Sequence, residues 1–420
     1  MTERLPLSRR LTLPSARFLL PSGVDPAVLP LLVGKGLRAF ADGYIAVLLP
    51  AYLLALGFGQ FDVGLLSTAT LAGSAVATLA VGGIGHRWSS QALLLGAALL
   101  MTATGLGFAA VTAFWPLLVV AFVGTINPGS GDVSVFLPLE HARLAHAAEG
   151  NARTALFARY SLTGSLCGAV GALASGVPAW LMTIAGTSLL TGLRAMFVVY
   201  GLVGAVIWLL YRRLPRERGA TEQITTPLGP SRPVVFKLAA LFSVDAFAGG
   251  LVVNSLLTLW LFERFGLSLG EAGVFFFWTG LLSAFSQLAA PVVARRIGLL
   301  NTMVFTHIPA NVFLILAAFA PSLPLALGLL FARAALSQMD VPTRTAFVMA
   351  AVTPAERAAA ASFTAVPRSL ASAASPTLAG ALMAAGLLSA PLVACGALKI
   401  VYDVTLLISC RHIRLPEDSR

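Results

Sequence analysis

The chain has 420 residues, of which 58% are hydrophobic and only 11% are charged, and its formal net charge is +11. Soluble domains carry about 25% charged residues, so this chain has too few polar side chains to cover a water-exposed surface. Its apolar runs are continuous and roughly 20 residues long, which fits transmembrane helices and excludes the alternating strands of a membrane β-barrel. The cations are neither clustered nor interleaved with aromatic residues, so we expect a lipid bilayer and not a nucleic acid as partner.

Motifs for catalysis and metal binding are lacking. There is no GxxxxGK[ST] loop for ATP and no HExxH helix, so neither an ATP-driven pump nor an enzyme is expected, and no cofactor is predicted. His141 and His146 do not have a standard ligand spacing for a metal. The three cysteines fall within or at the ends of apolar runs and have no disulfide or zinc spacing: Cys167, Cys395 and Cys410.

Hydropathy predicts an all-α membrane protein of twelve transmembrane helices. A polar stretch rich in Pro, Gly and Thr, residues 212–236, divides the chain into an N-terminal bundle (1–211) and a C-terminal bundle (237–420), each of six helices. The expected spans are 31–56, 62–84, 91–112, 115–138, 154–176, 192–211, 235–261, 269–293, 299–319, 324–347, 362–385 and 389–409.

Basic residues are concentrated at both ends of the chain and in every second connection between spans. One set of connections holds the basic residues of the N-terminal tail, Arg87, Arg143 with Arg153, the basic 212–236 segment, Arg295 with Arg296, Arg357 and the C-terminal arginines, while the other set offers only Arg194 and Arg264. The positive-inside rule therefore places both termini and the linker in the cytoplasm of a multi-pass inner membrane protein. The N-terminal stretch does not resemble a cleaved signal peptide.

The two halves align as parallel repeats. Asp42, Arg87, Asp132 and Arg159 match acidic or basic residues 203 to 209 positions later, namely Asp245, Arg296, Asp340 and Arg368. An insertion of six residues between the seventh and eighth spans explains the change in offset. Substrate sites are therefore expected near the membrane midplane, between the two halves.

Asp42 and Asp245 lie about 15 to 17 Å along their spans, near the midplane. A carboxylate is costly there, so it is retained mainly where it pairs, moves protons or touches a substrate. We expect both to be proton-coupling sites. The alternative for Asp42 is that Arg38, one helical turn away, neutralises it.

Asp132 and Arg159 are expected at similar depths near the cytoplasmic face, where they can meet. Asp340 and Arg368 repeat this arrangement, with Arg344 one turn from Asp340. These ion pairs are interpreted as cytoplasmic gates, acting with Arg87 and Arg296, or equally as permanent structural pairs.

Other polar residues fall on the same spans or on supporting ones. Lys399 and Asp403 are expected to neutralise each other. His307, Pro309 and Asn311 are expected to bend the ninth span or to meet polar partners buried in the membrane. The substrate cavity is expected to be lined by Arg38, Tyr44, Tyr52, Asn127, Asn254, Trp260 and Gln338. Such a sparsely charged lining suits amphipathic or hydrophobic organic solutes better than sugars.

The loop GGIGHRWSSQALLL keeps Gly82, Gly85 and Arg87 of a signature of the major facilitator superfamily, with His86 where aspartate is usual. A second copy keeps Arg295, Arg296 and Gly298. With twelve spans and a basic central linker, residues 31–410 resemble that superfamily, which implies two pseudo-symmetric six-helix bundles and alternating access. The glycine-rich fifth span, with Gly164, Gly168, Gly171 and Gly176, is similar to that of drug–proton antiporters, although its Gly-Pro order differs.

These observations predict a monomeric secondary transporter that exports a small organic solute. Transport is expected to be coupled to protons, which move either in exchange for the solute or together with it. One alternative is an organic-anion transporter that uses the membrane arginines Arg38, Arg159, Arg333, Arg344 and Arg368. A non-transporting receptor or scaffold is a second alternative, which the shortness of the loops disfavours.

Overall fold

The computed structural model describes residues 20–21, 24–129, 134–215, 228–353 and 356–411. Within these ranges the regular structure is entirely helical. Three short 3₁₀ turns, Pro26–Val28, Gly85–Arg87 and Ala174–Gly176, accompany the α-helices. The helices are α2 (Leu29–Ala55), α3 (Gln60–Ile84), α4 (Ser90–Ala110), α5 (Phe114–Val123), α6 (Phe136–His146), α7 (Gly150–Leu173), α8 (Val177–Ala185), α9 (Leu189–Tyr211), α10 (Arg232–Gly250), α11 (Asn254–Phe265), α12 (Leu269–Ile297), α13 (Leu299–Ala318), α14 (Leu323–Ser337), α15 (Asp340–Ala351), α16 (Arg357–Ala384) and α17 (Ala390–Cys410).

These helices form the twelve expected spans, because four spans consist of two helices each: α5 with α6, α7 with α8, α10 with α11 and α14 with α15. Nine spans of the described chain are long and apolar enough to cross a membrane. The others are the α5–α6 span, the α14–α15 span and α16, which contains Pro367 and Pro376.

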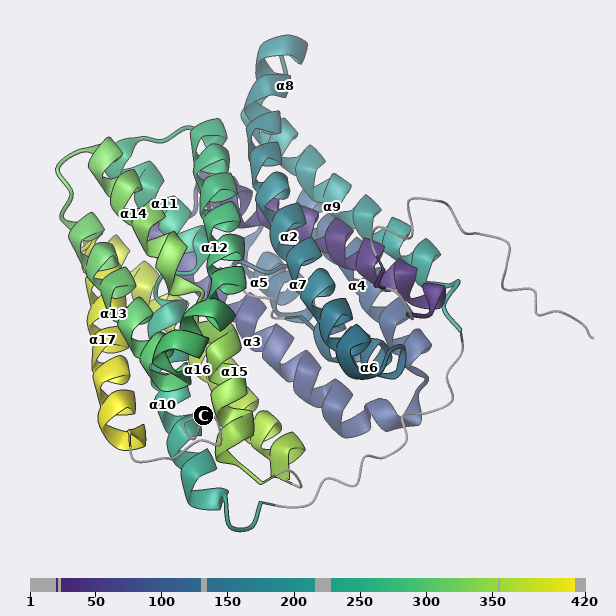
Figure 1. The fold of residues 1–420 in the computed structure, drawn as a ribbon. Helices are drawn as coiled ribbons and strands as arrows, with labels where there is room; N and C mark the ends of the chain where they lie inside the picture. Colours follow the sequence, from purple (N-terminus) through teal and green to yellow (C-terminus); the bar gives the residue numbers. More distant parts are fainter. Residues whose placement is uncertain (1–19, 22–23, 130–133, 216–227, 354–355, 412–420) are drawn as a thin grey trace, which may run out of the picture.

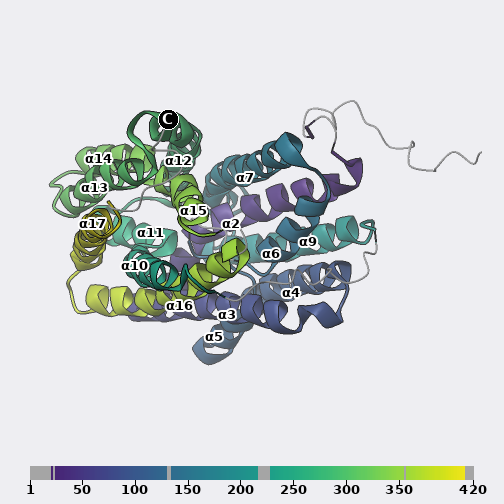
Figure 2. The same cartoon turned by 60° about the horizontal axis from the view of Figure 1, so that its bottom comes forward.

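The same packing pairs occur in both halves. In the first half α2 packs on α7 and α9, α4 on α9, and α3 on α5; in the second half α10 packs on α16 and α17, α13 on α17, and α12 on α14. Figure 2 shows the resulting two bundles side by side, with α3 and α16 meeting at their boundary. The chain therefore folds as two pseudo-symmetric six-helix bundles.

Three spans are interrupted where single helices were expected. The fourth is broken between Val123 and Phe136, the seventh at residues 251–253, and the tenth at residues 338–339. The first break contains Gly124, Pro128 and Gly129, residues that disfavour a continuing helix. The second follows Gly249 and Gly250. Backbone groups freed in this way must be satisfied inside the protein, and the Ser255 N–H donates to the Pro128 carbonyl across the boundary between bundles (3.0 Å).

The connection between the bundles is held by hydrogen bonds at the end that precedes α10. α9 ends at Tyr211 and α10 begins at Arg232, so the expected linker 212–236 overlaps the first turn of α10. The carboxylate of Glu356, just before α16, accepts hydrogen bonds from the backbone N–H groups of Gly229 and Ser231 and from the Thr353 hydroxyl. This attachment holds the end of the linker against the α15–α16 connection.

We term the face where α2 begins and α17 ends the terminal face. The bundles touch closely at the opposite face. A Cβ added to Gly64 at the start of α3 would lie 2.5 Å from the Pro376 carbonyl of α16, and one added to Gly273 of α12 would meet Ala172 and Ser175 at the end of the fifth span. Toward the terminal face the helix axes diverge (Figure 1).

Candidate functional site

Asp245 lies at the centre of a charged cluster inside the C-terminal bundle. The residue is 3% exposed. Lys399 of α17 donates to one carboxylate oxygen at 2.5 Å, and the Arg344 guanidinium of α15 lies 3.2 Å from the other. The sequence shows no basic residue within a turn of Asp245, but two other helices supply the cations. The desolvation cost of the carboxylate is thereby offset by two opposite charges.

Arg344 also binds Asp340, one turn earlier on α15. The ion pair expected between Asp340 and Arg368 is therefore wrong, because the nearer Arg344 occupies the aspartate. The Nε atoms of Arg333, Arg344 and Arg368 are buried without a hydrogen-bond partner among the described residues. Asp132, the counterpart of Asp340, lies outside the described residues, so the predicted Asp132–Arg159 gate stays a prediction.

Lys399 and Asp403 do not neutralise each other, contrary to expectation. Lys399 points to Asp245, whereas both carboxylate oxygens of Asp403 lie 3.0 Å from His307 Nδ1 on α13. The two side chains leave α17 one turn apart and reach different neighbours. α13 and α17, which were expected only to support the bundle, therefore contribute charged groups to its centre.

The N-terminal bundle contains a second buried ion pair. The guanidinium of Arg38 on α2 binds both carboxylate oxygens of Glu140 on α6, at 2.5 and 2.9 Å, and Glu140 is fully buried. The hydroxyls of Tyr160 on α7 and Tyr211 on α9 donate to the same carboxylate. The Arg38 guanidinium, which was the alternative partner for Asp42, is bound to Glu140 through both terminal nitrogens. Asp42 is half-buried and close enough to Tyr44 and Tyr200 to interact with them electrostatically.

The two ion pairs join corresponding spans with opposite polarity. In the N-terminal bundle the first span carries the cation, Arg38, and the fourth carries the carboxylate, Glu140. In the C-terminal bundle the first span carries the carboxylate, Asp245, and the fourth carries the cation, Arg344. The repeat thus preserves which helices are joined and reverses the sign of the charges.

Three predicted cavity residues are buried in helix packing instead. Tyr44, Tyr52 and Trp260 are each 0% exposed. The tyrosine hydroxyls donate to the carbonyls of Met196 (3.3 Å) and Phe108 (2.5 Å), and the Trp260 indole N–H donates to the Ser389 hydroxyl (3.3 Å). Their polar atoms are occupied by neighbouring helices, so the prediction that they line a cavity is wrong for this conformation. Arg38, bound to Glu140, likewise belongs to the bundle interior.

The remaining predicted cavity residues lie at the three helix breaks. Asn127 is in the fourth-span break, where its side-chain oxygen accepts from the Gly129 N–H at 3.0 Å. Asn254 is the first residue of α11. Gln338 lies between α14 and α15 and accepts a long hydrogen bond from Gln287 of α12 (3.5 Å). Asn127, Asn254 and Gln338 therefore all lie where the backbone of a span is interrupted.

Arg87 and Arg296 are exposed at the terminal face. In this conformation they hold no gate closed, which agrees with the divergence of the bundles there.

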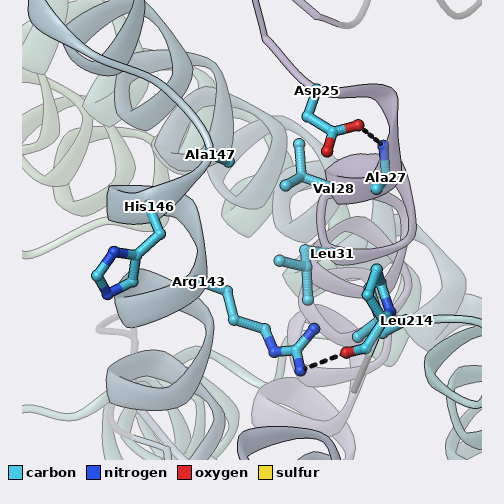
Figure 3. Close-up of a pocket in the computed structure, with 9 residues that line it drawn as sticks. Asp25, Ala27, Val28, Leu31, Arg143, His146, Ala147 and Leu214 are labelled. Carbon is cyan, nitrogen blue, oxygen red and sulfur yellow. Dashed lines mark hydrogen bonds between the residues drawn. The ribbon is translucent and has the colours of Figure 1, made fainter. Parts of the chain in front are cut away.

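A cavity of about 100 Å³ lies at the terminal end of the N-terminal bundle and is separate from both ion-pair clusters. Figure 3 shows it between Leu31 at the start of α2, His146 of α6 and Leu214 after α9. Arg143 spans its edge and donates to the Pro215 carbonyl and the Ser90 hydroxyl, both at 2.9 Å. Sites for drug-sized ligands measure about 300 to 1,000 Å³, so this cavity is too small for such a solute.

Sequence reasoning misses Glu140 as a site residue because it lies beyond residue 138, the expected end of the fourth span. The signal that points to it is the helical continuation beyond residue 138: α6 extends to His146 and buries Leu139, Glu140, Arg143 and Leu144 on one side. The partners of Asp245 were missed for another reason, since contacts between α10, α15 and α17 join residues far apart in the sequence.

Comparison with known proteins gives a consistent result. A model of the Major Facilitator Superfamily matches residues 31–376. An uncharacterized membrane protein of Saccharomyces cerevisiae, YJR124C, is 26% identical over 344 residues, which cover 73% of this chain and 77% of that protein.

Solved structures with the same fold include transporters for different solutes. The nucleoside transporter NupG has a TM-score of 0.70 at 16% identity and covers 92% of this chain and 99% of its own. A D-xylose–proton symporter has a TM-score of 0.71 at 14% identity, with coverages of 94% and 99%. The human organic anion transporter MFSD10 has a TM-score of 0.59 at 16% identity, with coverages of 90% and 98%. At these identities the likeness concerns the fold alone.

Proposed function

Because the chain belongs to the major facilitator superfamily, we propose that it is a proton-coupled secondary transporter that exports a small organic solute across the inner membrane by alternating access. We propose export because the glycine-rich fifth span is similar to that of drug–proton antiporters. The proposal places both termini in the cytoplasm, so that the diverging terminal face opens inward. The solute would bind between bundle 1–211 and bundle 237–420 of a monomer.

The observation that carries the proposal is the position of Asp245 between Lys399 and Arg344. All three groups are buried, and they come from three separate helices, α10, α17 and α15. Protonation of Asp245 would remove the negative charge that joins these helices, so proton binding would change their relative stability. This is the differential interaction that a ligand needs in order to shift a conformational equilibrium.

The test is Asp245→Asn in proteoliposomes. We expect loss of proton-driven uphill transport, while exchange of labelled for unlabelled solute at equal pH persists. Glu263→Gln removes an exposed carboxylate near the opposite face and serves as the matched control. Uphill transport at the normal rate in Asp245→Asn would remove Asp245 from the coupling mechanism, and Asp42→Asn would then test the second proposed proton site.

Transport of an organic anion is the second candidate, and one observation favours it. Within the described residues no carboxylate lies within ion-pair distance of Arg333 or Arg368, and their Nε atoms have no hydrogen-bond partner. Uncompensated cations inside a membrane protein are costly unless a ligand or water satisfies them. A human organic anion transporter among the proteins with this fold is consistent with this candidate.

A further inference from the structure

We propose that Arg344, Arg368 and Tyr402 form a binding site for the carboxylate or phosphate group of an anionic solute. The inference rests on the proposed transport function and specifies the chemistry of the solute. It starts from three donors of the C-terminal bundle that lack acceptors: Arg344 Nε, Arg368 Nε and the Tyr402 hydroxyl are all buried without a hydrogen-bond partner among the described residues. A buried donor without an acceptor has lost its hydrogen bonds to water without replacing them, and this is most costly for a charged group.

Two of the three donors lie beside one aromatic ring, and the third is close to both of them. The Arg344 guanidinium lies 5.5 Å from the ring centre of Phe242, and the Tyr402 ring lies 6.4 Å from the same ring. Arg368 is close enough to Arg344, Tyr402 and Asp245 to interact with them electrostatically. Phe242 and Tyr402 are only 1% and 2% exposed, whereas Arg368 is partly accessible. A solute would therefore approach past Arg368.

The charges around this point leave a place for one anion. Three cations, Arg344, Arg368 and Lys399, share two carboxylates, Asp245 and Asp340. Asp403 is hydrogen-bonded to His307, and a fourth cation, Arg333, is close enough to His307 to interact with it electrostatically. Four cations therefore face three carboxylates, which leaves one positive charge in excess. Arg344 uses its two terminal nitrogens for Asp245 and Asp340, so its Nε is left to donate. A ligand oxyanion would accept from Arg344, Arg368 and Tyr402 and would balance the excess positive charge without displacing either aspartate.

Arginine suits this task because its planar fork matches carboxylate and phosphate oxygens. Phe242 beside the donors would contact an apolar part of the solute. The site thus selects an amphipathic anion over its neutral analogue, since only the anion supplies the missing acceptor and charge.

The experiment measures binding to the purified full-length protein at constant pH, without any gradient. The probes are benzoate, its neutral analogue benzamide, and inorganic phosphate, followed by thermal stabilisation and titration calorimetry. We expect benzoate and phosphate to bind and benzamide to bind at least tenfold more weakly. Arg368→Gln should weaken anion binding about tenfold or more, and Tyr402→Phe severalfold, in line with the loss of charged and neutral hydrogen bonds.

Arg264→Gln is the matched control, because it removes the same charge from an exposed position on the same bundle. Arg368→Gln leaves no described carboxylate without its cation, so this variant should fold, and its unfolding curve without probe verifies that. Equal binding of benzamide, unchanged anion binding in Arg368→Gln, an equal loss in Arg264→Gln, or failure of both anions to bind the wild type would each overturn the inference. Asp245→Asn transport data separate this outcome from a failure of proton coupling, because anion binding here is measured without a gradient.

Discussion

The buried carboxylate of Glu140 connects four helices of the N-terminal bundle. Its oxygens accept from Arg38, Tyr160 and Tyr211, so one side chain of α6 joins α2, α7 and α9. Removing one partner of a buried ion pair leaves the other charge uncompensated, whereas a surface carboxylate contributes little.

Glu140→Ala is therefore expected to destabilise the N-terminal bundle by about 3 to 5 kcal/mol, measured as a lower unfolding midpoint in detergent. Glu149→Ala, at an exposed position, should change stability by no more than about 0.5 kcal/mol. The double variant Arg38→Met with Glu140→Ala should recover part of the loss, because no unpaired charge is left behind. Equal stability of the two single glutamate variants would contradict the role assigned to Glu140.

Glu356 gives a pH-dependent prediction outside the membrane. Hydrogen bonds from Ser231, and then from Gly229, hold the pKa of Glu356 below its usual value. A lowered pKa means that the ionised form is favoured in the folded state, so the attachment of the linker is complete above about pH 4.3 and is lost as the pH falls through the lowered pKa.

At neutral pH, Glu356→Gln should speed hydrogen exchange at the Gly229 and Ser231 amides relative to the wild type. The difference between the two proteins should shrink as the pH falls below about 4. Glu263→Gln should leave both amides unchanged. A difference that persists at low pH would show that the charge of Glu356 is not what holds the linker.

At the scale of elements, α3 and α16 approach closely where small residues meet. Gly64 faces Gly380, and the Thr377 hydroxyl lies 2.8 Å from the Thr68 hydroxyl. Because the bundles diverge at the other face, the proposed alternating access would require this contact to open in the complementary state.

Thr68→Cys combined with Thr377→Cys should therefore form a disulfide under mild oxidation and stop transport, and a reductant should restore it. Each single substitution should transport normally under both conditions. Full transport by the cross-linked protein would mean that this contact persists throughout the cycle.

Sequence reasoning found the spans because hydropathy is a local property, but it missed interactions that depend on tertiary packing. Asp245 was identified from its own apolar surroundings, whereas its partners Arg344 and Lys399 were assigned to other pairs because only i, i+4 neighbours are visible along a chain. After the break that contains Pro128, the fourth span continues as α6 to His146. Glu140 therefore belongs to the span, although hydropathy predicts that the span ends at residue 138. Tyr44 and Trp260 were assigned to a cavity from their spans alone, since the sequence does not fix which side of a helix faces the partner bundle.

For the whole molecule, the distribution of arginines predicts the orientation in the membrane. In a background without Cys167, Cys395 and Cys410, Arg296→Cys at the terminal face should react with an impermeant thiol reagent only in everted vesicles. Ala185→Cys, exposed at the opposite face, should react only in right-side-out vesicles. The reverse pattern would place the termini outside and invert the proposed direction of opening.

The hydrogen bond between the Ser255 N–H and the Pro128 carbonyl connects the interrupted backbones of the two halves near the middle of their spans. If the bundles turn about this junction, their far ends sweep through large arcs while the centre hardly shifts. A molecule held there would change the side from which water reaches it without itself travelling far.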